Sequence, residues 1–168
     1  TQADEFGRLY ESDPETAVSH VYDDAYEVGI ALRELGFTHN CAPVLDLFHS
    51  DGHAIIGNRA YGSAIHVVAS LAVACIHGLQ DAGIEAIGKH FPGHGDTNID
   101  SHRDLPIVRR SKDDVWAIDL APFRDGIKAG VDLVMTSHIL YEALDPENPA
   151  TFSKVILQDI LREKLCFQ

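Results

Sequence analysis

The chain has 168 residues, of which 45% are hydrophobic and 23% charged, a length and composition typical of one globular domain. Its 26 acidic residues outnumber its 13 basic ones, and the formal net charge of -13 would repel a phosphate backbone or an anionic lipid surface. We therefore expect neither nucleic acid nor a membrane as a partner.

The N-terminal stretch TQADEFGRLY lacks the basic and then apolar order of a signal peptide, and no apolar run reaches the roughly 18 to 20 residues of a membrane span. The cysteines Cys41, Cys75 and Cys166 are far apart and form no CxxC pair. An odd number of separated cysteines argues against a disulfide framework or a zinc ribbon. We expect three buried or half-buried thiols and a cytoplasmic protein.

The predicted elements alternate between helix and strand. A first helix should begin near Ser12, the N-cap of SDPE, and bury one apolar face whose residues are three and four positions apart. The residues of that face are Val18, Val21, Ala25, Val28, Leu32 and Leu35. Further helices are expected from about residue 63 to 82, from a Ser111 cap through Ile127, and from Ser153 into LREKLCF.

Short apolar runs between these helices predict buried strands at residues 38–46, 85–91 and 132–139. The helices end at evenly spaced glycines, which are Gly36, Gly83 and Gly130. A glycine directly after a helix favours the left-handed conformation that ends it. Repeated helix, glycine and strand units predict right-handed βαβ connections on a parallel sheet.

Two α/β architectures fit this alternation, an open doubly wound sheet and a closed (β/α)8 barrel. No GxGxxG or GxxxxGK[ST] turn follows a strand, so the nucleotide-binding open sheets lose their main support. Polar residues follow the strands instead, as on the C-terminal face of a barrel. They are Asp46, residues 57–59, residues 89–102, Ser137 and His138. We expect residues 57–59, 89–102 and His138 at one end of the sheet and the three glycines towards the other.

Three strands cannot close an eight-stranded barrel, so the fold is expected to be either open or part of a barrel. The segment KHFPGHGDTNIDSHRDLP, residues 89–106, is long for a connection from strand to helix, which usually has about 2 to 6 residues. We expect its histidines and aspartates to converge near one strand end. They are His90, His94, Asp96, Asp100 and His102.

Three interpretations of this segment remain open. His90, His94 and His102 are ligand types for a metal, although FPG breaks the helix that would place the first two on one face. The histidines could also serve only the loop backbone and solvent. In the catalytic interpretation, Asp100 and His102 project on the same side of an extended segment, so the carboxylate orients the imidazole for proton transfer. No GxSxG motif accompanies them, which argues against a serine hydrolase.

The motifs APVLDL, GNRAYG, KHFPGHGDTNIDSHRDLP and LVMTSHI together resemble the NagZ-type β-N-acetylglucosaminidases of glycoside hydrolase family 3. The resemblance spans nearly the whole chain, and KHFPGHG followed by DSH is specific to that branch. It implies a TIM (β/α)8 barrel in the parent enzyme. Residues 1–168 would be a central part of a single N-terminal barrel domain, truncated at both ends, with about three to four βα units.

The resemblance also implies an activity and residue roles. The enzyme would release terminal, non-reducing β-linked N-acetylglucosamine, typically from peptidoglycan fragments such as muropeptides, by a retaining mechanism and without a metal or organic cofactor. His102 would be the general acid/base, and Asp100 would orient it. The sugar would be bound by Arg59, Lys89 and His90, with Asp46 supporting the site.

Two features depart from the family pattern. The family nucleophile, an aspartate in a Ser-Asp-Asp-Leu-like motif, would follow residue 168, and the early strands would precede residue 1. FHSDGHAI also differs from the Asn- and Pro-rich loop of the family, between Leu47 and Ile56. We therefore expect the isolated chain to be inactive and to associate through exposed sheet edges. Phosphorolysis and a non-catalytic sugar-binding fragment are the alternative functions.

Overall fold

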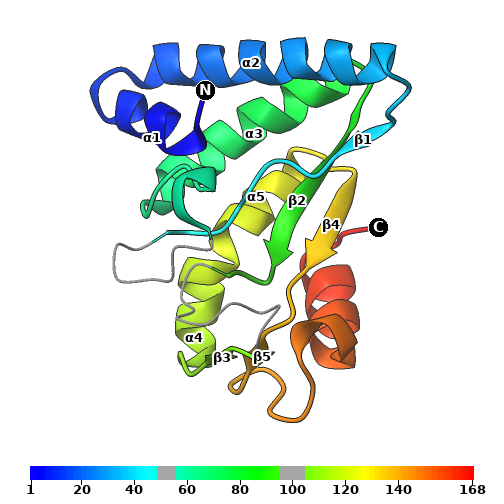
Figure 1. The fold of residues 1–168 in the computed structure, drawn as a ribbon. Coiled ribbons are helices and arrows are strands. Elements are labelled where there is room, and N and C mark those ends of the chain that lie inside the picture. The colour runs from blue at the N-terminus through cyan, green and yellow to red at the C-terminus, as the bar shows by residue number, and fades with distance from the viewer. Residues whose placement is uncertain (49–55, 95–104) are drawn as a thin grey trace.

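The computed structural model describes residues 1–48, 56–94 and 105–168 (Figure 1). Its first two helices are α1 (Ala3–Ser12) and α2 (Pro14–Glu34). Ser12 ends α1, so the predicted Ser12 cap was wrong. Asp13 caps α2 instead, because its carboxylate accepts hydrogen bonds from the backbone N of Thr16 (3.1 Å) and from Thr16 Oγ1 (2.7 Å). Pro14 occupies the first turn.

Helix α2 packs along α3 (Ile65–Asp81), and its buried face differs from the predicted one. The buried residues of α2 are Ala17, Val21, Ala25 and Gly29. Val28 and Leu35 are 42% and 76% exposed, so their predicted burial was wrong. The close approach of the two helices determines which residues of α2 are buried. A Cβ at Gly29 would lie 2.5 Å from the Cβ of Ala82. Small side chains, rather than the largest apolar ones, therefore line this interface.

A parallel sheet with the strand order β1-β2-β4 follows the predicted segments. Its strands are β1 (His39–Asn40), β2 (Glu85–Phe91) and β4 (Leu133–Thr136). Residues 41–46 lie outside β1 but continue along β2, because the backbone N of Ile87 donates to Ala42 O (2.9 Å) and that of Leu45 to Lys89 O (2.7 Å). The parallel α/β class is therefore as predicted.

The predicted polarity of the sheet is confirmed for the described residues. The three glycines that precede the strands have left-handed φ angles of +86°, +81° and +85°. They are Gly36, Gly83 and Gly130, and each lies at the amino-terminal end of a strand. The polar residues that follow the strands therefore gather at the opposite, carboxyl-terminal end, where the arrowheads of β2 and β4 point in Figure 1.

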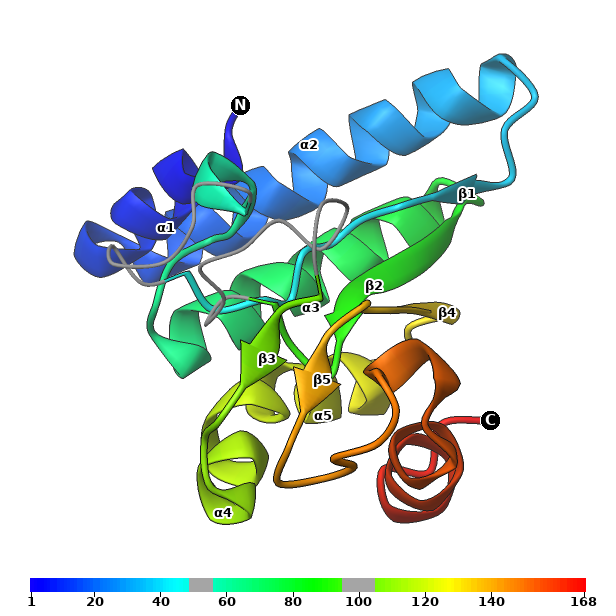
Figure 2. The same ribbon diagram turned by 60° about the horizontal axis from the view of Figure 1, so that its bottom comes forward.

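A second, two-stranded parallel sheet lies at this carboxyl-terminal end and was not predicted. Strand β3 (Ile107–Val108) pairs with β5 (Leu140–Tyr141), and Figure 2 shows the two side by side. Two-residue strands are too short to leave a periodic pattern in the sequence. They bring the segment after β4 against the segment that precedes the next helix.

The helix predicted from Ser111 to Ile127 is broken into three parts. They are α4 (Lys112–Asp114), a π-helical segment (Val115–Asp119) and α5 (Ala121–Lys128). Ser111 is the predicted cap, since its Oγ accepts from the backbone N of Asp114 (3.1 Å). The last element is a π-helix (Val155–Lys164), with Ser153 Oγ accepting from the backbone N of Ile156 (3.1 Å) as predicted. Within the described ranges no helix is both long and apolar enough to cross a bilayer.

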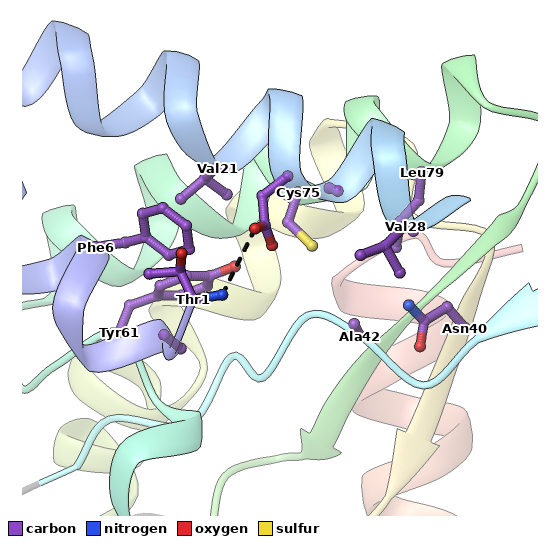
Figure 3. Close-up of a pocket in the computed structure, with 12 residues that line it drawn as sticks. Thr1, Phe6, Val21, Val28, Asn40, Ala42, Tyr61, Cys75 and Leu79 are labelled. Atoms are coloured by element: carbon purple, nitrogen blue, oxygen red, sulfur yellow. Dashed lines mark ion pairs between the residues drawn. The ribbon is translucent and has the colours of Figure 1, made fainter. Parts of the chain in front are cut away.

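A cavity of about 160 Å³ lies between α1, α2, α3 and the segment around β1 (Figure 3). Phe6, Val21 and Tyr61 line it, and at its rim the amino group of Thr1 lies 3.7 Å from Asp24 Oδ1. None of the predicted site residues lines this cavity. It is therefore separate from the carboxyl-terminal end of the sheet.

The cysteines differ from the expectation of three buried or half-buried thiols. Cys75 is buried beside this cavity, and burial raises the pKa of its thiol to about 11. Cys41 and Cys166 are exposed, so the expectation was wrong for both. Cys41 directly follows β1, an edge strand among the described residues, and Cys166 is one of the last three residues.

Candidate active site

Backbone pairing between the end of β2 and residues 43–46 builds the core of the site. The backbone N of Lys89 donates to Pro43 O (3.1 Å), and Val44 bridges to Lys89 in parallel. This register places Asp46 beside His90, the residue that follows Lys89 on β2. Two residues far apart in the sequence therefore meet because two parallel segments end together.

Asp46 accepts three hydrogen bonds and has a fully buried side chain. Its Oδ1 accepts from the backbone N of His90 (3.1 Å) and of His94 (2.8 Å), and its Oδ2 lies 2.7 Å from His90 Nδ1. A carboxylate only accepts, so Nδ1 of His90 carries the proton. The Nε2 of a neutral His90 is then an acceptor, available to a hydroxyl group.

Two cationic side chains accompany this pair. Lys89 is half-buried on β2, and Arg59 ends the 3-10 helix Gly57–Arg59 and is exposed. Burial lowers the pKa of Lys89, and the positive charge of Arg59 acts in the same direction, whereas Cys41 and Asp46 oppose the shift. The two cationic side chains are therefore near enough for their charges to act on each other.

His94 is the buried residue next to them. Its ring lies edge-on to that of His90, with centroids 5.6 Å apart, and only 5% of the residue is exposed. Burial lowers the pKa of His94, and the positive charge of Arg59 acts in the same direction, against opposing contributions from its own backbone and from Asp46. His94 is therefore a neutral ring that packs against His90 at neutral pH.

The predicted acid/base pair lies outside the described residues. Asp100 and His102, together with Asp96, fall within the range 95–104, so their predicted roles and convergence remain predictions. Of the predicted convergent set, the structure describes His90 and His94, and it brings them together.

The residues that flank this range are held by one segment after β4. Tyr141 is buried, and its hydroxyl donates to Gly93 O (2.7 Å) on the side that precedes residue 95. On the side that follows residue 104, the backbone N of Leu140 donates to Pro106 O (2.9 Å) and that of Glu142 to Val108 O (3.2 Å). The sequence did not indicate this role for Tyr141, because no local pattern connects it to Gly93.

The metal interpretation requires several ligand side chains close together. Within residues 1–48, 56–94 and 105–168, no group of three or more His, Cys, Asp or Glu side chains is arranged to hold a metal ion. His102, the third ligand of the metal interpretation, lies in the range 95–104. The described part of the site instead offers donors on Lys89 and Arg59 and an acceptor on His90, a combination suited to hydroxyl groups.

Comparisons with known proteins identify the family. Residues 8–168 match the glycosyl hydrolase family 3 N-terminal domain. A β-hexosaminidase of Stenotrophomonas maltophilia (strain K279a) is 40% identical over 164 residues, which are 98% of this chain and 48% of that protein. The chain thus spans about half the length of the curated relatives that it matches.

Solved structures extend the likeness to the fold. NagZ from Neisseria gonorrhoeae in complex with N-trifluoroacetyl-D-glucosamine superposes with a TM-score of 0.94 at 36% identity, over 99% of this chain and 49% of that one. A family 3 β-N-acetylglucosaminidase from Paenibacillus sp. str. FPU-7 gives a TM-score of 0.87 at 43% identity, over 89% of this chain and 29% of that one. The α/β fold is thus that of part of a TIM-type barrel, and the chain belongs to glycoside hydrolase family 3.

Proposed function

We propose that the full-length protein is a glycosidase that releases terminal, non-reducing β-linked N-acetylglucosamine by a retaining mechanism. The observation that carries this proposal is the meeting of Asp46, Arg59, Lys89 and His90 at the carboxyl-terminal end of the sheet. Family membership and relatives described as β-hexosaminidases support the class of substrate.

The described residues have the chemistry to bind a pyranose ring. A sugar hydroxyl both donates and accepts, so it suits a site with cationic donors and an imidazole acceptor side by side. Lys89 and Arg59 would donate to ring hydroxyls, and His90 Nε2 would accept. Asp46 would not touch the sugar, because its side chain is fully buried against His90 and His94.

The chemistry would come from residues outside the described ranges. His102 would protonate the departing oxygen and then deprotonate water, with Asp100 fixing its tautomer and orientation. The usual glycosidase has two carboxylates; here the dyad would replace the acid/base carboxylate. The nucleophile would be an aspartate that follows residue 168, on the opposite face of the sugar.

The test is turnover by purified full-length protein on an activated aryl β-N-acetylglucosaminide, with the matching β-glucoside as the control. Release of N-acetylglucosamine in phosphate-free buffer, with little turnover of the glucoside, is the expected result. If N-acetylglucosamine 1-phosphate forms, and only when phosphate is added, the protein is a phosphorylase rather than a hydrolase. Saturable binding of N-acetylglucosamine without turnover of either substrate would make the protein a sugar-binding one.

The assignment of His102 predicts a dependence on the leaving group. His102→Ala should lower kcat far more for a poor leaving group than for an activated aryl one, by roughly 10² to 10⁴-fold, because only the poor leaving group needs a proton. Asp100→Ala should show part of the same defect. His20→Ala, an exposed histidine on α2, is the matched control. Equal losses on both substrates would mean that His102 only binds.

The natural substrate and location are part of the same proposal. Muropeptides from peptidoglycan are the expected substrates, and the cytoplasm is the expected compartment. Assays on isolated muropeptides, with release of N-acetylglucosamine as the readout, test the first point. Fractionation of cells that express the full-length protein tests the second.

A further inference from the structure

The hydroxyl of Thr151 has three polar neighbours at the carboxyl-terminal end of β4. Thr151 Oγ1 lies 2.9 Å from Ser137 O, 3.0 Å from Thr136 Oγ1 and 2.9 Å from His138 Nδ1. A threonine hydroxyl has one proton to donate and two lone pairs with which to accept. The three contacts therefore use the whole hydrogen-bonding capacity of this group.

The direction of each bond follows from the carbonyl. Ser137 O can only accept, so the proton of Thr151 goes to it. Thr151 must then accept from the other two neighbours, and His138 Nδ1 is accordingly a donor. In a neutral ring with a proton on Nδ1, Nε2 has a free lone pair. Thr151 thus selects the tautomer in which His138 Nε2 is an acceptor.

This ring lies at the same end of the sheet as the pair formed by Asp46 and His90. Phe91 pairs with Thr136 across β2 and β4, and the backbone N of Ser137 donates to Phe91 O (2.8 Å). His138 therefore lies two residues beyond Thr136, the partner of Phe91 across the sheet. It is exposed, so a solute can reach it.

His90 and His138 each have an oxygen partner at Nδ1, but the partner groups differ. Nδ1 of His90 donates to the carboxylate of Asp46 (2.7 Å), and Nδ1 of His138 to the hydroxyl of Thr151 (2.9 Å). Both rings would then carry an unprotonated Nε2 at the ends of neighbouring parallel strands. Two Nε2 acceptors, each set by a buried or half-buried partner, suit a ligand rich in hydroxyl groups.

We propose that His138 is a ligand-binding residue whose Nε2 accepts a hydrogen bond from a hydroxyl or amide N–H of the bound saccharide, with Thr151 as the positioning residue that fixes its tautomer. The proposal rests on the proposed function for the identity of the ligand. The tautomer itself follows from Thr151 and its three neighbours alone.

The tautomer can be read without any activity. Long-range ¹H–¹⁵N correlation spectra of the full-length protein distinguish the two neutral tautomers, at roughly two pH units above the ordinary histidine pKa of about 6.5. His138→Gln identifies the signals. A proton on Nδ1, with a shift of the Nε2 resonance when N-acetylglucosamine is added, is the expected result. A proton on Nε2 in the free protein would overturn the proposal.

Two pairs of variants test the ligand contact. The amide of His138→Gln can reach the place of Nε2, whereas that of His138→Asn reaches only the place of Nδ1. We expect His138→Asn to raise KM on the order of tenfold with a smaller change in kcat, and His138→Gln to raise it less. Thr151→Val should likewise raise KM, and Thr151→Ser, which restores the hydroxyl, should recover most of the loss.

The outcomes separate the binding role from a structural one. A His138→Asn variant with the KM of the wild type would show that Nε2 binds nothing and would overturn the proposal. Circular dichroism and thermal unfolding identify any variant that fails to fold, and the wild-type spectra remain decisive in that case. If the wild type does not turn over the β-N-acetylglucosaminide, the proposed function fails, while the Nδ1 proton and a sugar-dependent Nε2 shift would still stand.

Discussion

Asp46 determines the geometry of the described part of the site, because one buried carboxylate orients a backbone turn and a histidine ring together. It accepts from the backbone N of His90 and His94 and from His90 Nδ1. In the same way, one hydroxyl, that of Thr151, would orient the ring of His138. At the residue scale, the site therefore depends on acceptors that fix where imidazole protons lie.

Asp46→Asn should both destabilise the protein and impair binding. The amide NH₂ cannot accept, so at least one buried donor among the three loses its partner, at a cost of about 1–3 kcal/mol. Denaturant unfolding and KM for the aryl glycoside are the measurements. Asp125→Asn, which removes an exposed partner of Lys128, is the matched control and should change the unfolding free energy by less than about 1 kcal/mol. Unchanged stability in Asp46→Asn would contradict the inferred role of the carboxylate.

Sugar binding should weaken at alkaline pH, when Lys89 loses its charge. Burial lowers its pKa from the ordinary value of 10.5, so the ammonium is present below the lowered pKa and is lost as the pH rises through it. The dissociation constant for N-acetylglucosamine should therefore rise at a pH below 10.5. In Lys89→Arg the charge persists to a pKa above about 12, so the rise should move to higher pH. Identical profiles for the two proteins would exclude Lys89 as the titrating group.

At the scale of elements, α2 and α3 pack through small residues, which let their backbones come close together. Gly29 lies against Ala82, and a Cβ at Gly78 would clash with the carbonyl oxygen of Tyr22. Both glycines face the partner helix, and the larger Val28 and Leu35 remain exposed. The seam is thus built from the residues that let two helices come close.

Two glycines inside helices provide a test of this seam. Gly78→Ala should destabilise the protein by about 1–3 kcal/mol, because its Cβ would meet rigid backbone of α2. Gly126→Ala on α5 is the matched control: its Cβ would lie 3.4 Å from Leu45 Cδ1, an ordinary contact. There the better helix propensity of alanine, worth up to about 1 kcal/mol, should offset any cost. Urea denaturation measures the free energy of unfolding of both variants. Equal losses in the two would argue against helix proximity as the cause of the Gly78→Ala destabilisation.

At the scale of the whole molecule, the sheet has two edge strands within the described residues. The order β1-β2-β4 leaves one side of β1 and one side of β4 without a strand partner there. Leu133 on β4 is 40% exposed, and Phe37 before β1 is 56% exposed. Edge strands with apolar side chains nearby are templates for pairing with other chains.

Residues 1–168 expressed alone should therefore associate and lack glycosidase activity. Association should follow from the open edges, and inactivity from the absence of a nucleophile motif in the chain. Light scattering across a dilution series and an assay on the aryl β-N-acetylglucosaminide measure the two properties. A monomer with turnover comparable to the full-length protein, abolished by changing one carboxylate within residues 1–168, would place the nucleophile inside this chain.

The sequence by itself determined the alternation of helix, glycine and strand and the polarity of the sheet. These features are local: a cap such as Ser111 or Ser153 bonds to a backbone N three residues away, and a left-handed glycine ends its own helix. The strand at residues 85–91 was predicted with its observed bounds for the same reason. Asp46 and His90 could be expected to meet because parallel strands end together.

Only the tertiary structure decided which face of α2 is buried, how β3 and β5 pair, and which side chains lie against His90 and His138. Each of these depends on a partner distant in sequence: α3 for α2, β5 for β3, Asp46 for His90 and Thr151 for His138. Hydrophobic periodicity reports that a face is apolar but not which neighbour packs against it, and a residue type does not reveal its hydrogen-bond partner. Packing and pairing across the fold supply that information.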